Sequence, residues 1–151
     1  MMRVGVGVIG CGNILGAYVL GLRRLAPVRL VGCADLDVSR AHAAAEAHRV
    51  RAFDSVEALL CDESVELVVN LTPPLAHGSV SRAALEGGKR VFSEKPIAAT
   101  VAEADSVMAA LADPGRMGSA PDTFLAGPGQ TARAAIHALR AHPGRPCAAR
   151  D

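Results

Sequence analysis

The feature that most constrains the fold is a glycine-rich turn near the start of the chain. The apolar run Val4–Ile9 ends at Gly10-Cys11-Gly12, and residues 14–25 follow with apolar side chains at helical spacing. An apolar run closed by glycines is typical of a buried strand, so this stretch predicts a strand, a tight turn and a helix. At such a turn a phosphate can approach bare backbone at the positive end of the helix.

The glycine pattern departs from the common G-x-G-x-x-G form, because its third position is Leu15. We therefore expect close packing of the helix on the strand to be achieved differently, with Gly16 as the candidate one residue later. An isolated G-x-G is equally explained by glycines that only turn the chain, so the motif depends on its context.

Strands and helices alternate along the rest of the chain. The capping residues Asp37 and Ser55 and the capping box from Thr100 to Glu103 mark three helix starts. Expected strands after the first are 29–34, 51–53, 66–70, 90–94 and 117–120, and expected helices after the first are 38–48, 56–61, 75–86 and 101 to about 112. Apolar strands alternating with helices predict an α/β fold, a doubly wound parallel sheet with helices on both faces.

An acidic residue, Asp35, closes the second expected strand. Following a glycine turn, a carboxylate at this place accepts hydrogen bonds from the ribose hydroxyls of a dinucleotide, so the pattern predicts a Rossmann-like nucleotide site. The alternative is that Asp35 only caps the next helix. The carboxylate would repel the 2′-phosphate of NADP, although Arg40 could partly offset it, so we expect NAD in preference to NADP.

Composition narrows the class of partner. Sixteen basic and fifteen acidic residues give a net charge of +1 and are mixed along the chain, so neither nucleic acid nor a membrane surface is an expected partner. Four cysteines lie far apart without a C-x-x-C pair, which indicates reduced thiols and no metal site. We expect a cytoplasmic protein with a small-molecule partner.

Three segments resemble the Gfo/Idh/MocA family of glucose-fructose oxidoreductases and inositol dehydrogenases. They are Val8-Ile9-Gly10-Cys11-Gly12-Asn13-Ile14, then Asn70-Leu71-Thr72-Pro73-Pro74 with His77, and finally Gly88-Lys89-Arg90-Val91-Phe92-Ser93-Glu94-Lys95-Pro96. The resemblance covers nearly the whole chain, and the Glu-Lys-Pro triplet is far more specific than the glycine turn.

The resemblance implies hydride transfer between NAD(P) and a hydroxyl-bearing substrate such as a sugar or polyol. Lys95 is the implied catalytic residue, because a cation beside the substrate hydroxyl stabilises the developing alkoxide. The implied cofactor-binding residues are Gly10, Gly12, Asn13, Ile14, Asp35, Arg40, Thr72, Pro73, His77, Glu94 and Lys95. His77 could equally be a residue of a helix's first turn.

The end of the chain departs from the family pattern. Residues 1–120 are the expected nucleotide-binding domain, and 121–151 are expected to form a crossover helix (130–140) and the start of a second α+β substrate domain that is otherwise absent. Most relatives carry Asn or Gln, two basic residues and Phe where this chain has Pro121-Asp122-Thr123-Phe124. We therefore expect a truncated chain that is not active alone, and a homo-oligomer only if the second domain is present.

Two other functions stay open on the sequence. A cofactor-sensing regulator without catalysis would keep the glycine turn but would need a partner-binding surface. A purely structural module would have no use for Asp35 together with Glu94-Lys95-Pro96.

Overall fold

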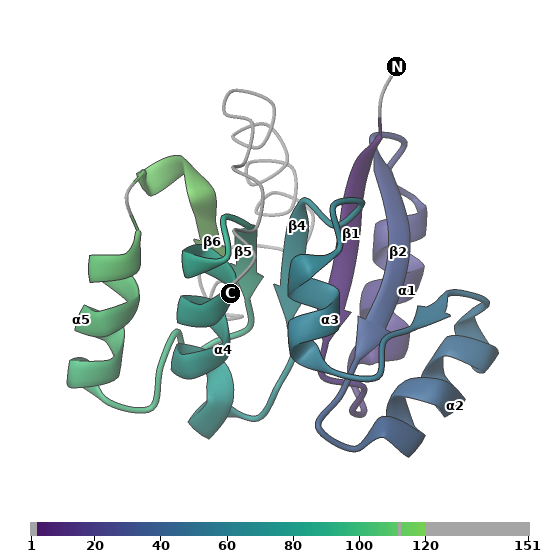
Figure 1. The fold of residues 1–151 in the computed structure, drawn as a ribbon, viewed down its shortest axis with the longest axis horizontal. Coiled ribbons are helices and arrows are strands. Elements are labelled where there is room, and N and C mark those ends of the chain that lie inside the picture. The colour runs from purple at the N-terminus through teal and green to yellow at the C-terminus, as the bar shows by residue number, and fades with distance from the viewer. Residues whose placement is uncertain (1–2, 112, 120–151) are drawn as a thin grey trace.

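The computed structural model describes residues 3–111 and 113–119, which form one twisted parallel sheet covered by helices (Figure 1). The strands are β1 (Val4–Ile9), β2 (Val28–Ala34), β3 (Arg51–Ala52), β4 (Leu67–Asn70), β5 (Arg90–Ser93) and β6 (Met117–Ser119). The helices are α1 (Leu15–Arg23), α2 (Val38–His48), α3 (Val56–Cys61), α4 (Pro74–Glu86) and α5 (Val101–Ala110), with a 3₁₀ turn at Pro114–Arg116.

The strand order is β3-β2-β1-β4-β5-β6, and each neighbouring pair is parallel. The chain first builds outward from β1 to β3, then returns to the other side of β1 and builds outward again. The direction of winding therefore reverses between β1 and β4. In open parallel sheets, the crevice at the carboxyl ends of the strands beside such a reversal is where ligands bind.

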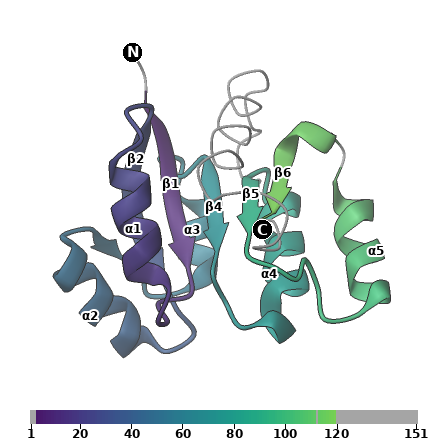
Figure 2. The ribbon, with the colours of Figure 1, turned by 180° about the vertical axis from the view of Figure 1, so that it is seen from behind.

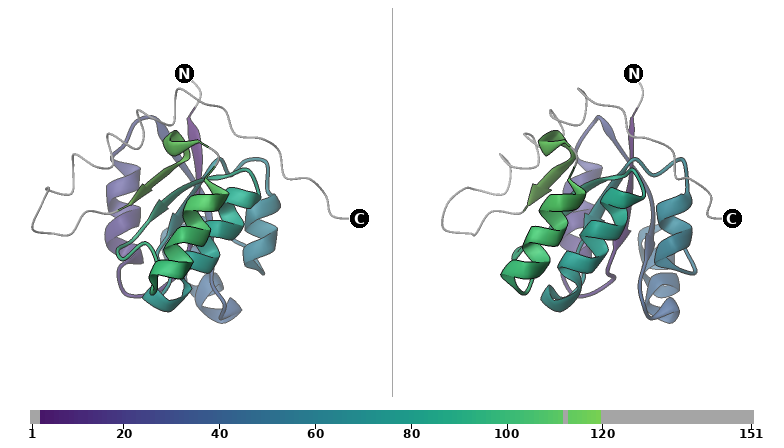
Figure 3. Two further views of the ribbon diagram at one scale, coloured as in Figure 1. Left: turned by 90° about the vertical axis from the view of Figure 1, so that its left-hand side faces the viewer. Right: turned by 60° about the vertical axis from the view of Figure 1, so that its left-hand side comes forward.

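Two apolar cores, one on each face of the sheet, follow from the alternation of side chains along the strands. Leu15, Val19 and Leu22 of α1 and Ala45 of α2 pack on Val6 and Val8 at one face, while Ile9 and Val68 face α3, α4 and α5 at the other. Figure 2 shows α1 in front of β1 from behind, and Figure 3 shows the sheet between the two helix layers. The expected doubly wound fold is confirmed.

The expected helix caps are present. Asp37 accepts a hydrogen bond from the Ser39 amide, Ser55 from that of Ala58, and Thr100 from that of Glu103. Element ends differ from the sequence expectations by no more than two residues. Helix α1 ends at Arg23 rather than Leu25, because the Arg24 and Leu25 amides bond the carbonyl oxygens three residues back instead of four. The expected strand end at residue 120 and everything assigned to 121–151 lie outside the described residues.

The expectation for Gly16 is wrong. A Cβ added at Gly16 would have no atom within 4 Å, while Leu15 is 4% exposed and belongs to the core. The close approach occurs instead at Gly10, where φ is +101° and an added Cβ would lie 2.6–2.7 Å from the backbone of Leu71 and Thr72. Gly10 therefore lets the end of β1 pass directly against the segment after β4.

Within residues 3–111 and 113–119, no helix has the length and apolar character needed to cross a membrane.

Candidate nucleotide-binding site

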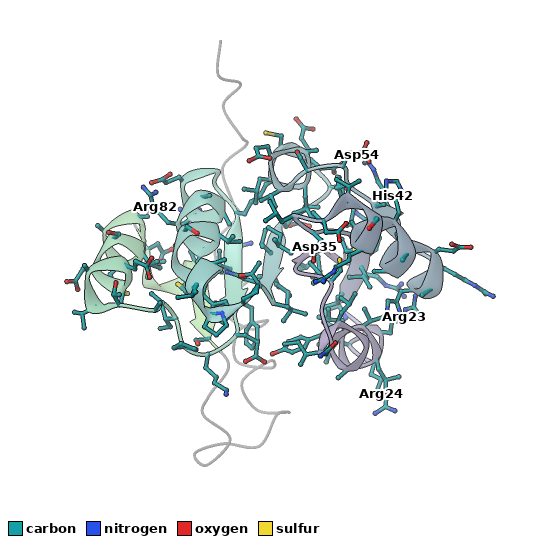
Figure 4. All side chains as sticks on the ribbon, turned by 90° about the horizontal axis from the view of Figure 1, so that it is seen from below. Arg23, Arg24, Asp35, His42, Asp54 and Arg82 are labelled. Carbon is teal, nitrogen blue, oxygen red and sulfur yellow. The ribbon has the colours of Figure 1, made fainter. Side chains whose placement is uncertain are left out.

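The carboxyl ends of the parallel strands lie at one edge of the sheet, the lower edge in Figure 1, onto which Figure 4 looks directly. The glycine turn follows β1 there, Asp35 follows β2, Thr72 and Pro73 follow β4, and the Glu-Lys-Pro triplet follows β5. The fold thus brings segments that are more than eighty residues apart in the sequence to a single edge.

Asp35 joins the end of β2 to the glycine turn. Its Oδ2 accepts a hydrogen bond from the Cys11 amide at 2.7 Å, and its Oδ1 accepts one from the Asp37 amide at 2.9 Å. The helix cap itself is supplied by Asp37, so Asp35 is not the capping residue of α2. Each carboxylate oxygen has a second lone-pair direction, which leaves Asp35 able to accept further hydrogen bonds.

Arg40 lies on the first turn of α2 and forms an ion pair with Asp37 at 3.6 Å. The two side chains are 66% and 53% exposed, so the pair contributes little to stability. Because the Arg40 side chain is two-thirds exposed, its charge remains accessible to solvent.

The start of α1 is open for an anion. Ile14 precedes the helix without a side-chain cap, and the first turn carries no acidic residue. Gly12 is exposed, and an added Cβ there would have no protein atom within 4 Å. Asn13 is exposed and Ile14 is 43% exposed. Backbone amides at a helix start with space in front of them form an anion-binding site.

A buried polar cluster organises the segment after β4. The side-chain nitrogen Nδ2 of Asn70 donates to the His77 backbone carbonyl oxygen and to the Ser81 hydroxyl, both at 3.0 Å. The side-chain oxygen Oδ1 of Asn70 accepts hydrogen bonds from the Thr72 backbone amide at 3.2 Å and from the Thr72 hydroxyl at 2.7 Å. Asn70 and Ser81 are fully buried, so the loop carrying Thr72 and Pro73 is fixed to the body of α4.

His77 connects this loop to the triplet. Its Nδ1 lies 2.5 Å from the Pro96 carbonyl oxygen and its Nε2 lies 2.6 Å from the Thr72 carbonyl oxygen. The side chain is 2% exposed. Because both ring nitrogens are engaged by backbone carbonyls, the imidazole ties two loops of the edge together.

Glu94 is oriented by hydrogen bonds from two directions. The Tyr18 hydroxyl of α1 donates to its Oε1 at 2.5 Å, and the Lys95 amide donates to its Oε2 at 3.0 Å. Burial, followed by the bond to this carboxylate and its charge, raises the pKa of Tyr18 above its usual range. Lys95 is exposed and is joined to Pro96 by a cis peptide bond. Helix α1 and the Glu-Lys-Pro triplet are thus in direct contact.

Sequence reasoning missed Tyr18 and the role of Asn70. Tyr18 adjoins the buried helical stripe of Leu15, Val19 and Leu22, and it is the chain's single tyrosine, so its position at the margin of a buried helix face was a usable signal. The Tyr18 ring also packs at a tilt on Phe92, with 6.3 Å between centroids. For Asn70, a polar residue ending an apolar strand was the available signal.

A doubly wound parallel sheet with a glycine turn, a free helix start and a strand-end carboxylate at its winding reversal defines the class of dinucleotide-binding domains. Comparison with known proteins places the chain within that class. The Gfo/Idh/MocA sequence model, described as an oxidoreductase family with an NAD-binding Rossmann fold, matches residues 4–120. The chain belongs to this family.

Individual relatives agree with this assignment. An inositol 2-dehydrogenase from Rubrobacter xylanophilus is 35% identical over 115 residues, which cover 76% of this chain and 33% of the relative. The solved myo-inositol dehydrogenase from Lactobacillus casei, in complex with NAD(H) and myo-inositol, has a TM-score of 0.72 and 28% identity, covering 78% of this chain and 36% of that one.

A solved 3-ketoreductase from Actinomadura kijaniata, in complex with NADP, has a TM-score of 0.71 and 25% identity over 78% of this chain and 38% of its own. Proteins similar to this chain therefore include complexes with either dinucleotide. The matched part of this chain spans about a third of the length of that inositol 2-dehydrogenase, 33%.

Proposed function

We propose that the chain binds NAD at the carboxyl edge of its sheet and presents Lys95 to a sugar or polyol hydroxyl in a hydride-transfer reaction. The observation that carries the proposal is the contact of Asp35 with the glycine turn, because it joins the ribose-binding carboxylate and the phosphate-binding backbone in one unit. Asn13, Ile14, Thr72 and Pro73 border that unit in this proposal.

The residues present fit the dinucleotide. The open space at Gly12 and the uncapped start of α1 suit a pyrophosphate, and Asp35 keeps lone pairs for two ribose hydroxyls. When bound, NAD supplies the hydride acceptor. His77 serves this site by holding the Thr72 and Pro96 loops together rather than by touching the nucleotide.

Lys95 and Glu94 supply the chemistry of the chain itself. Lys95 is exposed and flanks the strand end, so its ammonium group can reach a substrate hydroxyl and stabilise negative charge as the proton leaves. The bond from the Lys95 amide to Glu94 fixes the backbone from which that side chain extends. The Glu94 carboxylate accepts a hydrogen bond from the Tyr18 hydroxyl, which holds the triplet against α1.

The Asp35 charge is expected to make NAD bind more tightly than NADP by about 1 kcal/mol or more, because it repels the 2′-phosphate. Titration calorimetry with both nucleotides measures the preference. Asp35→Asn keeps an oxygen for the Cys11 amide and removes the charge, so it should shrink the preference, whereas Arg40→Ala should enlarge it. Equal or tighter binding of NADP by the unmodified chain would refute the role given to Asp35.

A second test addresses Lys95. Since the side chain is exposed and offered to substrate rather than to the nucleotide phosphates, Lys95→Met should leave the affinity for NAD within about twofold. Calorimetry measures this affinity. A loss of NAD binding as large as that caused by changes in the glycine turn would show that Lys95 holds the nucleotide instead.

A further inference from the structure

Three cationic residues lie at the amino ends of the last two strands, at the upper edge of the sheet in Figure 1. Lys89 precedes β5, Arg90 begins it, and Arg116 precedes β6. This edge is opposite to the one that carries the candidate nucleotide site. Arg90 pairs in register with Leu67 of β4, which belongs to the apolar cluster beneath α1, so the Arg90 side chain lies on the α1 face of the sheet.

Two of these three cations are bonded to backbone carbonyl oxygens. The Lys89 ammonium group donates to the carbonyl oxygen of Asp62 at 2.9 Å and to that of Val65 at 2.8 Å. Nη2 of Arg116 donates to the carbonyl oxygen of Leu85 at 2.9 Å and to that of Lys89 at 2.8 Å. A carbonyl oxygen satisfies a donor but carries no full negative charge, so both groups keep their positive charge at this edge.

Arg90 differs from its two neighbours because part of its guanidinium group has no acceptor. The residue is 2% exposed, and its Nε and Nη2 atoms are buried without a hydrogen-bond partner among the residues that the structure describes. Leaving a buried donor unpaired is costly, and more so when the donor is charged, which is why nearly all such groups in folded proteins are paired. The burial of Arg90 therefore calls for an acceptor.

The positions of the two unpaired atoms define what kind of acceptor fits. The N–H bonds of Nε and Nη2 leave the planar guanidinium group in parallel from one edge. This edge binds both oxygens of a carboxylate or of a phosphate through two parallel hydrogen bonds, whereas a single hydroxyl or carbonyl oxygen fits it less well. The two unpaired atoms of Arg90 are therefore suited to an oxyanion.

The charges around Arg90 also favour an anion. Burial lowers the pKa of Arg90, the charges of Glu66 and Asp113 raise it, and the charge of Arg116 lowers it. Neither carboxylate is bonded to Nε or Nη2 of Arg90. Because Lys89, Arg90 and Arg116 are three cations against two carboxylates, this edge keeps an excess of positive charge that attracts an anion.

We propose that Arg90 is the centre of an oxyanion-binding site at the amino edge of the sheet, which takes phosphate or a small carboxylate through Nε and Nη2. The site does not depend on the proposed function, because the candidate nucleotide site lies at the opposite edge. Since both nitrogen atoms are buried, the side chains around them have to move before an anion can enter. We therefore expect slow exchange of the anion and a folded state that the anion stabilises.

Urea unfolding of the full chain tests the site, with sodium phosphate or sodium acetate replacing sodium chloride at constant ionic strength. The urea midpoint should rise with the concentration of the anion, because the anion binds the folded state. Arg90→Met should lose this rise, and its midpoint without the anion should be no lower, because a buried unpaired charge has been removed. Arg82→Met is the matched control. It removes an exposed arginine of α4 that pairs with Glu86, and it should keep the rise.

Nuclear magnetic resonance provides a second measurement that does not require Arg90→Met to fold. The Nε–H resonance of Arg90, identified by its absence in the conservative variant Arg90→Lys, should shift in the unmodified chain as the anion is added. A shift with phosphate alone identifies phosphate as the ligand, and a shift with acetate alone identifies a carboxylate. Either result supports the oxyanion site.

Three results would overturn the site. The first is a midpoint and an Arg90 resonance that neither anion changes. The second is a rise in midpoint that persists in Arg90→Met, because the anion would then bind elsewhere, as at the start of α1. The third is a shift of the Arg90 resonance in Asp122→Asn or Asp151→Asn without added anion. These are the two acidic residues of the chain outside the described residues, and such a shift would show that one of them is the acceptor.

Discussion

Gly12→Val is expected to abolish NAD binding while the domain stays folded. A Cβ at Gly12 meets no protein atom, so the valine fits the nucleotide-free chain, but it fills the space proposed for the pyrophosphate. Calorimetry should show no measurable binding, and circular dichroism and urea unfolding should match those of the unmodified chain.

Two glycines of the same region serve as controls for that variant. Gly21→Ala lies on α1 with open space around it, so it should bind NAD normally and gain up to about 1 kcal/mol of stability. Gly10→Ala should instead damage the fold, because its positive φ and the neighbouring backbone leave no place for a methyl group. Normal NAD binding by Gly12→Val would show that the glycine turn only reverses the chain and does not receive the nucleotide phosphates.

Asn70→Leu is expected to lower the free energy of unfolding by about 3 kcal/mol or more. Leucine has a similar size, but it leaves four buried or half-buried polar groups without their partner, and each such group costs about 1–3 kcal/mol. Urea unfolding followed by circular dichroism measures the loss.

The exposed Ser106→Ala is the matched control for Asn70→Leu. It removes a single hydroxyl bond, to the Ala102 carbonyl oxygen of the same helix, and should change stability by less than about 0.5 kcal/mol. If Asn70→Leu unfolded at the same urea concentration as this control, the polar cluster would have no role in fixing the loop after β4.

Much of the architecture could be predicted because its signals are local. The glycine turn, the caps Asp37, Ser55 and Thr100, and the apolar strands each depend on a few neighbouring residues, and together they predicted the layer arrangement that the structure has. The wrong expectation for Gly16 arose because packing depends on which residues face each other across strands. Gly10 packs against Leu71, sixty-one residues later, and no local pattern shows this.

The candidate site was predictable in its members but not in their contacts. Asp35, Glu94 and Lys95 could be named from spacing and resemblance, and the fold brings them to one edge. Tyr18 bonds to a residue 76 positions away, and His77 connects two loops by its two ring nitrogens. Such pairings depend on the complete topology.

The bond between Tyr18 and Glu94 also bears on the order in which the domain forms. The residues up to β3 make a sequential strand-helix unit that can pair as it leaves the ribosome, because each contact closes a short loop. Tyr18 bonds a residue that directly follows β5, and β5 is joined to β1 through β4, so this contact closes a much longer loop. We therefore expect the edge to be completed late in folding, so that a ligand that needs both halves does not guide the early steps. It stabilises the finished domain instead, by an amount that grows with its concentration.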